Sequence, residues 1–252
     1  MNILGIIPAR YTSLRFPGKP LAMIDGKSMI QRVYEQAVKA DSLKWLVVAT
    51  DNREIYNHVR RFGGMVMMTS DNHPNGTSRC LEVTNKLEAE HKNISIDAVI
   101  NIQGDEPYIQ PVQIDALAGL FMDSATDIAT LAKKIDHNEQ VFDPNVVKVV
   151  VNNEGFAMLF SRQAVPFGRD LPQMEWFNRF NYLKHIGIYG YRNTVLKKIV
   201  DLPVSPLEGF EKLEQLRWLE NGYNIKVELT DYESMSVDTP EDLKKLLQTI
   251  QK

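Results

Sequence analysis

The sequence opens with an apolar run, Ile3-Leu-Gly-Ile-Ile7, that leads into the loop Pro8-Ala-Arg10-Tyr-Thr-Ser-Leu-Arg15-Phe-Pro-Gly-Lys19-Pro20. The run predicts a β-strand buried on both faces, because its apolar residues are nearly continuous. The loop carries three cations and two hydroxyls within a dozen residues. Guanidinium groups pair bidentately with phosphate oxygens, and a lysine adds a point charge. We therefore predict a loop that grips a triphosphate; a solvated basic loop is the alternative.

Apolar runs alternate with amphipathic segments after this first strand. Strands expected to follow it are Leu46–Ala49, Met65–Met68 and Ala98–Ile102, and the expected helices are Met29–Ala40, Arg53–Phe62 and Ser78–Glu90. This alternation predicts a mostly parallel sheet with helical crossovers, in a three-layer, Rossmann-like α/β fold.

The pattern changes near residue 127. Four strand-like runs follow with few helices between them: Ile128–Leu131, Val146–Val151, Ala157–Phe160 and Ile186–Tyr191. They predict an antiparallel lobe at about 127–195, inserted into a single α/β domain spanning residues 1–252. The α/β pattern then returns with a helix at Leu207–Glu220, a strand at Ile225–Leu229 and a helix at Glu241–Gln251.

Polar clusters follow three of the expected strands. These clusters are Pro8–Lys19, Thr50-Asp51 and Gln103–Pro107. Ligands of open α/β sheets bind beyond the carboxyl ends of the strands, so we expect the chemistry there.

Composition narrows the partners and the compartment. The net charge of −3 gives no general basic surface for nucleic acid. No signal-peptide pattern and no membrane-length apolar run is present, so we expect no membrane insertion. The single cysteine, Cys80, cannot form an internal disulfide, which fits a reducing compartment. We expect a cytoplasmic protein.

Two familiar nucleotide motifs do not fit the sequence. Gly26-Lys27-Ser28 ends like a Walker loop, but Leu21 stands where that motif needs its first glycine. The segment is better interpreted as a turn at Asp25-Gly26. A dinucleotide fingerprint is also absent after the first strand, which continues as Gly5-Ile-Ile-Pro-Ala-Arg10.

The motifs resemble those of the sugar nucleotidylyltransferases. Pro8-Ala-Arg10, Arg15 and Pro17-Gly-Lys-Pro20 are similar to the signature loop of that family. More narrowly, the chain resembles the 3-deoxy-manno-octulosonate cytidylyltransferases, the CMP-Kdo synthetases. The matching blocks run from end to end: Ile6–Pro20, Val48–Asp51, Gly76–Arg79, Asn101–Pro107, Asp143–Val150, Phe160–Arg162, His185–Arg192, Ser205–Glu208, Leu213–Arg217 and Val237–Asp242.

The resemblance implies a fold of the nucleotide-diphospho-sugar transferase type, with a small lobe for dimerisation and substrate binding. It also implies the reaction CTP + Kdo → CMP-Kdo + pyrophosphate, for lipopolysaccharide biosynthesis, in a homodimer. Two departures leave a Kdo analogue or another acidic sugar open. Ser78 stands where the family usually has an acidic residue, and Phe167-Gly168 replaces the more usual Trp-Asp before Arg169.

Site residues are carried over from the family by position. Arg10, Arg15, Lys19 and Asp105 are implied to be catalytic, and Asp105 and Asp238 to hold Mg²⁺. For Asp238, capping of the helix after Thr239-Pro240 is the competing interpretation. The implied nucleotide site comprises Pro8, Ala9, Arg10, Lys19, Thr77, Arg79 and Gln103. The implied sugar site comprises Gln103, Arg162, Arg169, His185, Tyr189, Glu214 and Gln215.

Three other functional classes would also bind a nucleotide. A glycosyltransferase would typically show Asp-x-Asp, but Gln103 occupies the first position. A transferase for a different acidic sugar or an alditol phosphate would share the loop. A non-catalytic nucleotide-binding regulator would bind CTP without chemistry, and the intact Asp105 and Asp238 argue against it.

Overall fold

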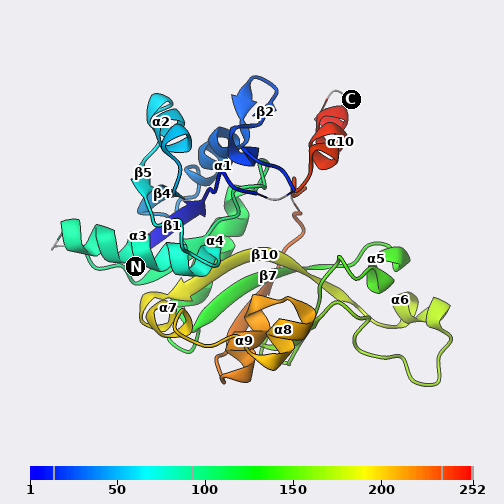
Figure 1. The fold of residues 1–252 in the computed structure, drawn as a ribbon. Coiled ribbons are helices and arrows are strands. Elements are labelled where there is room, and N and C mark those ends of the chain that lie inside the picture. The colour runs from blue at the N-terminus through cyan, green and yellow to red at the C-terminus, as the bar shows by residue number, and fades with distance from the viewer. Residues whose placement is uncertain (14, 92–93, 234, 251–252) are drawn as a thin grey trace. The chain divides into compact units, whose positions relative to one another are not determined.

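A computed structural model describes residues 1–13, 15–91, 94–233 and 235–250 (Figure 1). Contacts divide the chain into two compact units. The first unit is Met1–Gly119 together with Ser234–Lys252, and the second is Leu120–Glu233. The C-terminal segment of the chain therefore belongs to the same unit as residues 1–119, although more than a hundred residues separate the two in the sequence.

Parallel strands form the sheet of the first unit. They are β1 (Ile3–Pro8), β4 (Trp45–Thr50), β5 (Val66–Met68) and β6 (Ala98–Asn101). β1 pairs with β6 on one side and with β4 on the other, and β4 pairs with β5. Leu4, Ile6 and Ile7 of β1 have no exposed surface, as expected for a central strand covered on both faces. The predicted parallel α/β sheet is confirmed.

Several helices of this unit begin at a capping side chain. They are α1 (Met29–Ala37), α2 (Arg53–Arg61), α3 (Gly76–Glu90), α4 (Pro111–Gly119) and α10 (Pro240–Ile250), with a 3-10 turn η1 at Lys19–Leu21. Side chains of Ser28, Asn52 and Asn75 accept hydrogen bonds from the first turns of α1, α2 and α3. Asp25 and Gly26 both have positive φ, 46° and 77°, and join the short strands β2 (Met23–Ile24) and β3 (Lys27–Ser28). The predicted turn is confirmed, whereas α4 was not predicted.

The second unit holds a mixed sheet. β10 (Leu183–Arg192) pairs antiparallel with β7 (Ile128–Lys134) and β8 (Lys148–Val151), and β8 pairs antiparallel with β9 (Ala157–Ser161). β11 (Ile225–Leu229) lies parallel to β7. The lobe expected at about 127–195 lies within this unit. Its helices are η2 (Leu120–Met122), α5 (Asn138–Phe142), η3 (Gln173–Glu175), α6 (Trp176–Arg179), α7 (Asn193–Ile199), α8 (Pro206–Glu211) and α9 (Glu214–Glu220).

The single helix predicted over Leu207–Glu220 is wrong. Lys212 adopts a left-handed conformation with φ of 56°, which ends α8 before α9 begins. The two short helices are joined by Arg217, whose Nε and Nη2 donate to the two carboxylate oxygens of Glu208 at 2.7 and 2.6 Å. Glu208 also completes a capping box with Ser205 at the start of α8.

Candidate active site

Lys19 lies between two carboxylates that are 133 positions apart in the sequence, Asp105 and Asp238. Its Nζ is 2.7 Å from Asp105 Oδ2 and 3.2 Å from Asp238 Oδ1. Arg15 Nη2 also reaches Asp238 Oδ1, at 3.1 Å, although the Arg15 side chain is 67% exposed. Two acidic residues from separate loops thus converge on one cation.

Backbone and core contacts bring Asp238 to this place. Val237 donates its N–H to the carbonyl of Asp105 at 3.0 Å. The Val237 side chain is fully buried in a cluster with Ile24, Met29 and Leu246 of α10, and Phe16 of the cation loop packs against the same cluster. The apolar cluster therefore fixes the loop of Lys19 and the peptide before Asp238 together.

The start of α10 shows which acidic residue caps the helix. Thr239 Oγ1 accepts from the N–H of Asp242 at 3.2 Å, and the Asp242 carboxylate accepts from the N–H of Thr239 at 3.0 Å. This is a capping box made by Thr239 and Asp242. The predicted N-cap at Thr239 is confirmed, and the Asp238 carboxylate is left to face Lys19.

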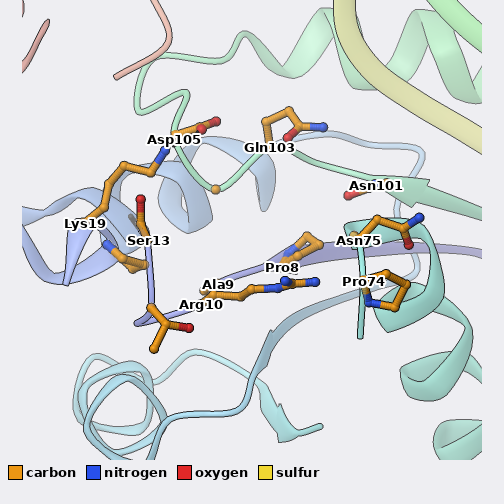
Figure 2. A pocket seen from close by; sticks show the side chains of 14 residues that line it. Pro8, Ala9, Arg10, Ser13, Lys19, Pro74, Asn75, Asn101, Gln103 and Asp105 are labelled. Atoms are coloured by element: carbon orange, nitrogen blue, oxygen red, sulfur yellow. Dashed lines mark hydrogen bonds and ion pairs between the residues drawn. The ribbon is translucent and has the colours of Figure 1, made fainter. Parts of the chain in front are cut away.

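A pocket of about 340 Å³ adjoins this cluster in the first unit (Figure 2). It is lined by Pro8, Ala9, Arg10, Thr12, Ser13, Lys19, Pro20, Pro74, Asn75, Gly76, Asn101, Gln103, Gly104 and Asp105. Lys19 reaches toward Asp105 at one end, and Asn75 and Asn101 lie at the other. Two of the three predicted clusters at strand ends therefore meet in one cavity.

Gly104 allows the ends of β1 and β6 to meet at the pocket. A Cβ atom at this position would lie 2.7 Å from the carbonyl oxygen of Pro8, closer than Cβ atoms approach backbone. The glycine between Gln103 and Asp105 is therefore required by close packing of two backbone segments.

Arg10 lies along the pocket wall, and its Nη2 donates to the carbonyl of His73 at 2.5 Å. Burial and the neighbouring Arg79 lower the pKa of Arg10 from its ordinary value, while Asp51 opposes that shift. A guanidinium stays charged after such a shift, so the wall presents a partly desolvated cation. An incoming phosphate would compensate both the burial and the repulsion from Arg79.

The remaining predicted base-side residues lie on α3, behind the pocket wall. Arg79 is fully buried; its Nη2 donates to Asp51 Oδ2 at 2.7 Å and its Nη1 donates to Thr69 Oγ1. Thr77 is also buried, and neither residue lines the pocket. Asp51, from the third predicted cluster, thus pairs with Arg79 and is not among the residues that line the pocket.

Two of the predicted sugar residues belong to an aromatic group in the second unit. The His185 ring lies 5.1 Å from the Tyr189 ring, and Tyr189 stands edge-on to Trp218 at 5.1 Å. Although residue 185 keeps some exposed surface, Phe160 and Tyr189 enclose its ring, and this burial lowers the pKa of His185 to about 3. His185 is therefore neutral at pH 7, and its Nε2 lies 3.0 Å from Thr130 Oγ1.

The other predicted sugar residues of this unit differ in exposure. Arg162 is held by carbonyl oxygens, with Nε donating to Glu211 at 2.8 Å and Nη1 to Pro144 at 2.9 Å. The Arg169 side chain is 90% exposed. Glu214 and Gln215 stand in the first turn of α9, and Gln215 is buried.

Several residues with clear roles were not singled out from the sequence. Pro74 and Asn75 line the pocket just before α3, and the helix start at Asn-Gly was the available signal for Asn75. Lys148 is fully buried, and its Nζ donates to the carbonyls of Asp143, Val146 and Arg162 at 2.8, 2.6 and 2.6 Å. Nothing in the sequence marks this lysine as internal.

The donor set at Lys19 fits a magnesium ion with ligands from outside the chain. Within the described residues, no group of three or more His, Cys, Asp or Glu side chains gathers to form a metal site. Mg²⁺ is commonly held by one or two carboxylates plus phosphate oxygens and water. Asp105 and Asp238, already converging on one ammonium group beside a pocket, match that requirement.

Comparison with known proteins points to one family. The cytidylyltransferase family model matches residues 4–228. A 3-deoxy-manno-octulosonate cytidylyltransferase of Parabacteroides distasonis is 51% identical over 98% of this chain and 97% of its own length. Its namesake from Bacteroides thetaiotaomicron is also 51% identical, over 97% and 96% of the two chains.

Solved structures agree with the sequence relatives. A CMP:2-keto-3-deoxy-manno-octonic acid synthetase in complex with CTP has 40% identity and a TM-score of 0.90, covering 100% of this chain and 99% of that one. A 4-diphosphocytidyl-2C-methyl-D-erythritol synthase from Anaerococcus prevotii, 12% identical with a TM-score of 0.63 over 100% and 96% of the two chains, shares the fold. The chain belongs to the cytidylyltransferase family, among the 3-deoxy-manno-octulosonate cytidylyltransferases.

Proposed function

We propose that this chain catalyses the reaction CTP + Kdo → CMP-Kdo + pyrophosphate. The observation that carries the proposal is the convergence of Lys19, Asp105 and Asp238 at one end of the pocket. The family relatives named for this reaction, with about half of their residues identical, supply the substrates. A cation held by two carboxylates beside a cavity is suited to a metal-bound triphosphate.

The pocket is proposed to bind CTP along its length. Arg10, Arg15 and Lys19 supply positive charge for the phosphates. Pro8, Ala9, Asn75, Gly76, Asn101 and Gln103 are proposed to contact the nucleoside. Arg79 and Thr77 lie behind this lining, so we propose that they act by shaping it, with Arg79 fixed by Asp51 and Thr69.

Asp105 and Asp238 are proposed to hold Mg²⁺. When bound there, Mg²⁺ supplies neutralisation of phosphate charge and lowers the pKa of a coordinated hydroxyl. For this to happen, Lys19 leaves the two carboxylates and turns to the phosphates. Its Nζ lies within 3.2 Å of both carboxylates, so it occupies the place that the ion would take.

The chemical step is an in-line displacement at the α-phosphorus of CTP. The anomeric hydroxyl oxygen of Kdo forms the new P–O bond, its proton is released, and the bond to pyrophosphate breaks. Lys19, Arg10 and Arg15 stabilise the charge that accumulates on the leaving pyrophosphate. Catalysis then comes mainly from positioning and electrostatic stabilisation.

The second unit is proposed to bind the sugar. Arg162 and Arg169 supply cations for an acidic sugar, and His185, Tyr189, Glu214 and Gln215 supply hydrogen-bonding groups. His185 is proposed to act as a neutral donor or acceptor, because burial keeps its pKa at about 3. Another acidic sugar remains the alternative acceptor. The reason is that the departure at Phe167-Gly168 lies next to Arg169, a proposed sugar residue whose side chain is 90% exposed.

The assembly and setting of the enzyme are proposed from the family. Large apolar side chains exposed in the second unit, including Phe210 at 91%, Met174 at 78% and Phe167 at 76%, support a homodimer. Sedimentation analysis would measure its mass. Among the described residues, each helix is too short or too polar to cross a membrane. We propose a cytoplasmic role in activating Kdo for lipopolysaccharide biosynthesis.

The decisive experiment measures pyrophosphate release with Mg²⁺ and a matrix of substrates. We expect release with CTP and Kdo, and little with UTP, with ATP or with sialic acid. Release only with another acidic sugar would identify the alternative acceptor. CTP binding without release for any acceptor would identify a regulator and contradict the proposed reaction.

Asp105→Asn tests the role of the carboxylate in the same assay. We expect turnover to fall by on the order of 10²-fold or more, because a preorganised electrostatic contact is removed. Asp97→Asn is the matched control. Asp97 accepts a hydrogen bond from the N–H of Asn2 at 2.7 Å in the same unit and does not line the pocket, so near-normal turnover is expected. Near-normal turnover of Asp105→Asn would contradict the mechanism.

A further inference from the structure

We propose that His73 and Glu82 are positioning residues that hold Arg10 in the pocket wall. Neither residue lines the cavity, and both act through the backbone segment 70–75 that precedes α3. The inference rests on the proposed function, in which Arg10 binds the phosphates of CTP.

The first link is the contact between Arg10 and the segment. Arg10 Nη2 donates to the main-chain carbonyl of His73 at 2.5 Å. Arg10 is partly buried, and the like charge of Arg79 acts on it. A fixed acceptor is therefore needed to keep the guanidinium at the wall, and the His73 carbonyl is such an acceptor. Its position depends on a loop, because residue 73 lies between β5 and α3.

The second link fixes the loop through the His73 ring. Nε2 is hydrogen-bonded to Glu82 Oε2, and Nδ1 lies 3.1 Å from Ser78 Oγ. Ser78 Oγ in turn donates to the carbonyl of Asn75 at 3.1 Å. Both ring nitrogens are thus tied to α3, which restrains the His73 side chain and with it the loop.

The third link makes Glu82 the common anchor of the segment. Glu82 Oε2 also accepts from the N–H of Ser70 at 2.9 Å, and Oε1 pairs with Lys86 Nζ at 2.6 Å. Lys86 donates to the carbonyl of Met68 at 2.8 Å, at the end of β5. Although burial opposes it, pairing with Lys86 and His73 lowers the pKa of Glu82 to about 2. The anchor therefore carries its charge throughout the neutral range.

These links connect the surface of α3 to the cavity in a definite order. Glu82 is hydrogen-bonded to the His73 ring and to the N–H of Ser70 at the start of the segment. The restrained ring in turn positions the main-chain carbonyl of His73, which accepts the hydrogen bond from Arg10. Ser78 matters in this order, because its hydroxyl contacts the ring. Ser78 Oγ thus contacts both the ring and the carbonyl of Asn75 at the start of α3.

A double-mutant cycle tests whether Glu82 acts through Arg10. We expect Glu82→Gln to lower kcat/KM for CTP by about tenfold, the loss from removing ~1.4 kcal/mol of positioning. In an Arg10→Ala background the same substitution should change kcat/KM by less than about twofold, because nothing remains to position. His73→Ala keeps the backbone carbonyl but loses both ring contacts, and it should behave like Glu82→Gln.

Glu35→Gln is the matched control. Glu35 is also a helix carboxylate with a lowered pKa, paired with Lys27 at 2.6 Å and hydrogen-bonded to Gln31, but it lies on α1 away from the pocket lining. Its kcat/KM should match that of the unmodified protein. Thermal unfolding of each variant, followed by circular dichroism, identifies any that fails to fold; if Glu82→Gln does, the cycle is run with His73→Ala.

The outcomes separate this inference from the proposed function. An equal loss from Glu82→Gln in both backgrounds would show a merely structural role and overturn the inference. An unchanged kcat/KM in Glu82→Gln, with a clear loss in Arg10→Ala, would also overturn it while leaving the proposed function intact. An unchanged kcat/KM in Arg10→Ala would instead remove the role of Arg10 on which both depend.

Discussion

Lys19→Met should tighten binding of Mg²⁺ to the nucleotide-free protein while it slows turnover. The Lys19 ammonium occupies the space between Asp105 and Asp238, at 2.7 and 3.2 Å. A divalent ion that binds the same carboxylates must displace it. Methionine keeps much of the volume of the side chain and removes the competing charge.

The magnitude follows from the exposure of the two ion pairs. The contact with Asp105 joins side chains that are 15% and 23% exposed, so we assign it ~1.5–3 kcal/mol as a charge-assisted hydrogen bond. The contact with Asp238 is longer, involves a side chain that is 38% exposed and is shared with Arg15, so it adds about 0–1 kcal/mol. The sum of ~1.5–4 kcal/mol corresponds to a dissociation constant roughly 10- to 10³-fold lower in the variant.

The assay titrates the protein with Mn²⁺, an oxygen-preferring substitute for Mg²⁺, and follows the free ion by electron paramagnetic resonance without CTP. Lys27→Met is the control, because Lys27 pairs with Glu35 at 2.6 Å in the same unit but away from the pocket. Equal affinities of Lys19→Met and the unmodified protein would refute the competition. Equal tightening in both variants would show an effect of net charge alone. Turnover of Lys19→Met should fall by on the order of 10²-fold.

Three further predictions concern stability and packing. Gly104→Ala should lower both the melting temperature and turnover, because its Cβ would meet the Pro8 carbonyl at 2.7 Å; Gly119→Ala, with open space around it, should change neither by much. His185→Gln should make the free energy of unfolding fall less steeply as the pH is lowered. The pKa of His185 is about 3 in the folded protein and lies below the unfolded value, so the unfolded chain takes up a proton first and stability is lost as pH falls from about 6.5 toward 3. Arg217→Lys should lower the free energy of unfolding by ~1–2 kcal/mol in urea titrations, because a lysine cannot reproduce the bidentate pairing with its glutamate.

The fold was predictable wherever periodicity or turn chemistry was strong. Apolar runs identified most of the strands, and Asp25-Gly26 identified a turn. The helix α4 was not predicted because Pro111–Gly119 is apolar on most sides and has no single apolar face with helical spacing. The break at Lys212 was not predicted because no glycine or proline stands at that position. A lysine there adopts a left-handed conformation that usually selects glycine.

The position of the pocket was predictable from the order of polar clusters after strands. The family resemblance added Asp238 to the predicted site residues. From the local sequence alone, Asp238 could equally have been a residue that caps the following helix. Contacts between individual side chains could not be predicted from the sequence. The pairing of Arg79 with Asp51, and of Glu82 with His73, depends on which way α3 faces after it packs. Sequence spacing alone does not fix such a rotation between a helix and a loop.

Lys19 couples the two ligands of the proposed site. Its ammonium group cannot pair with Asp105 and also bind a phosphate with full strength. In the proposed mechanism, CTP that attracts Lys19 would free the carboxylates, and Mg²⁺ bound by the carboxylates would free Lys19 for CTP. Linkage then requires each ligand to raise the affinity of the other by the same factor. Part of that factor comes from direct contact between metal and phosphate, which Lys19→Met keeps. The rest comes from Lys19 itself, so the mutual enhancement should shrink in the variant even though Mg²⁺ alone binds it more tightly.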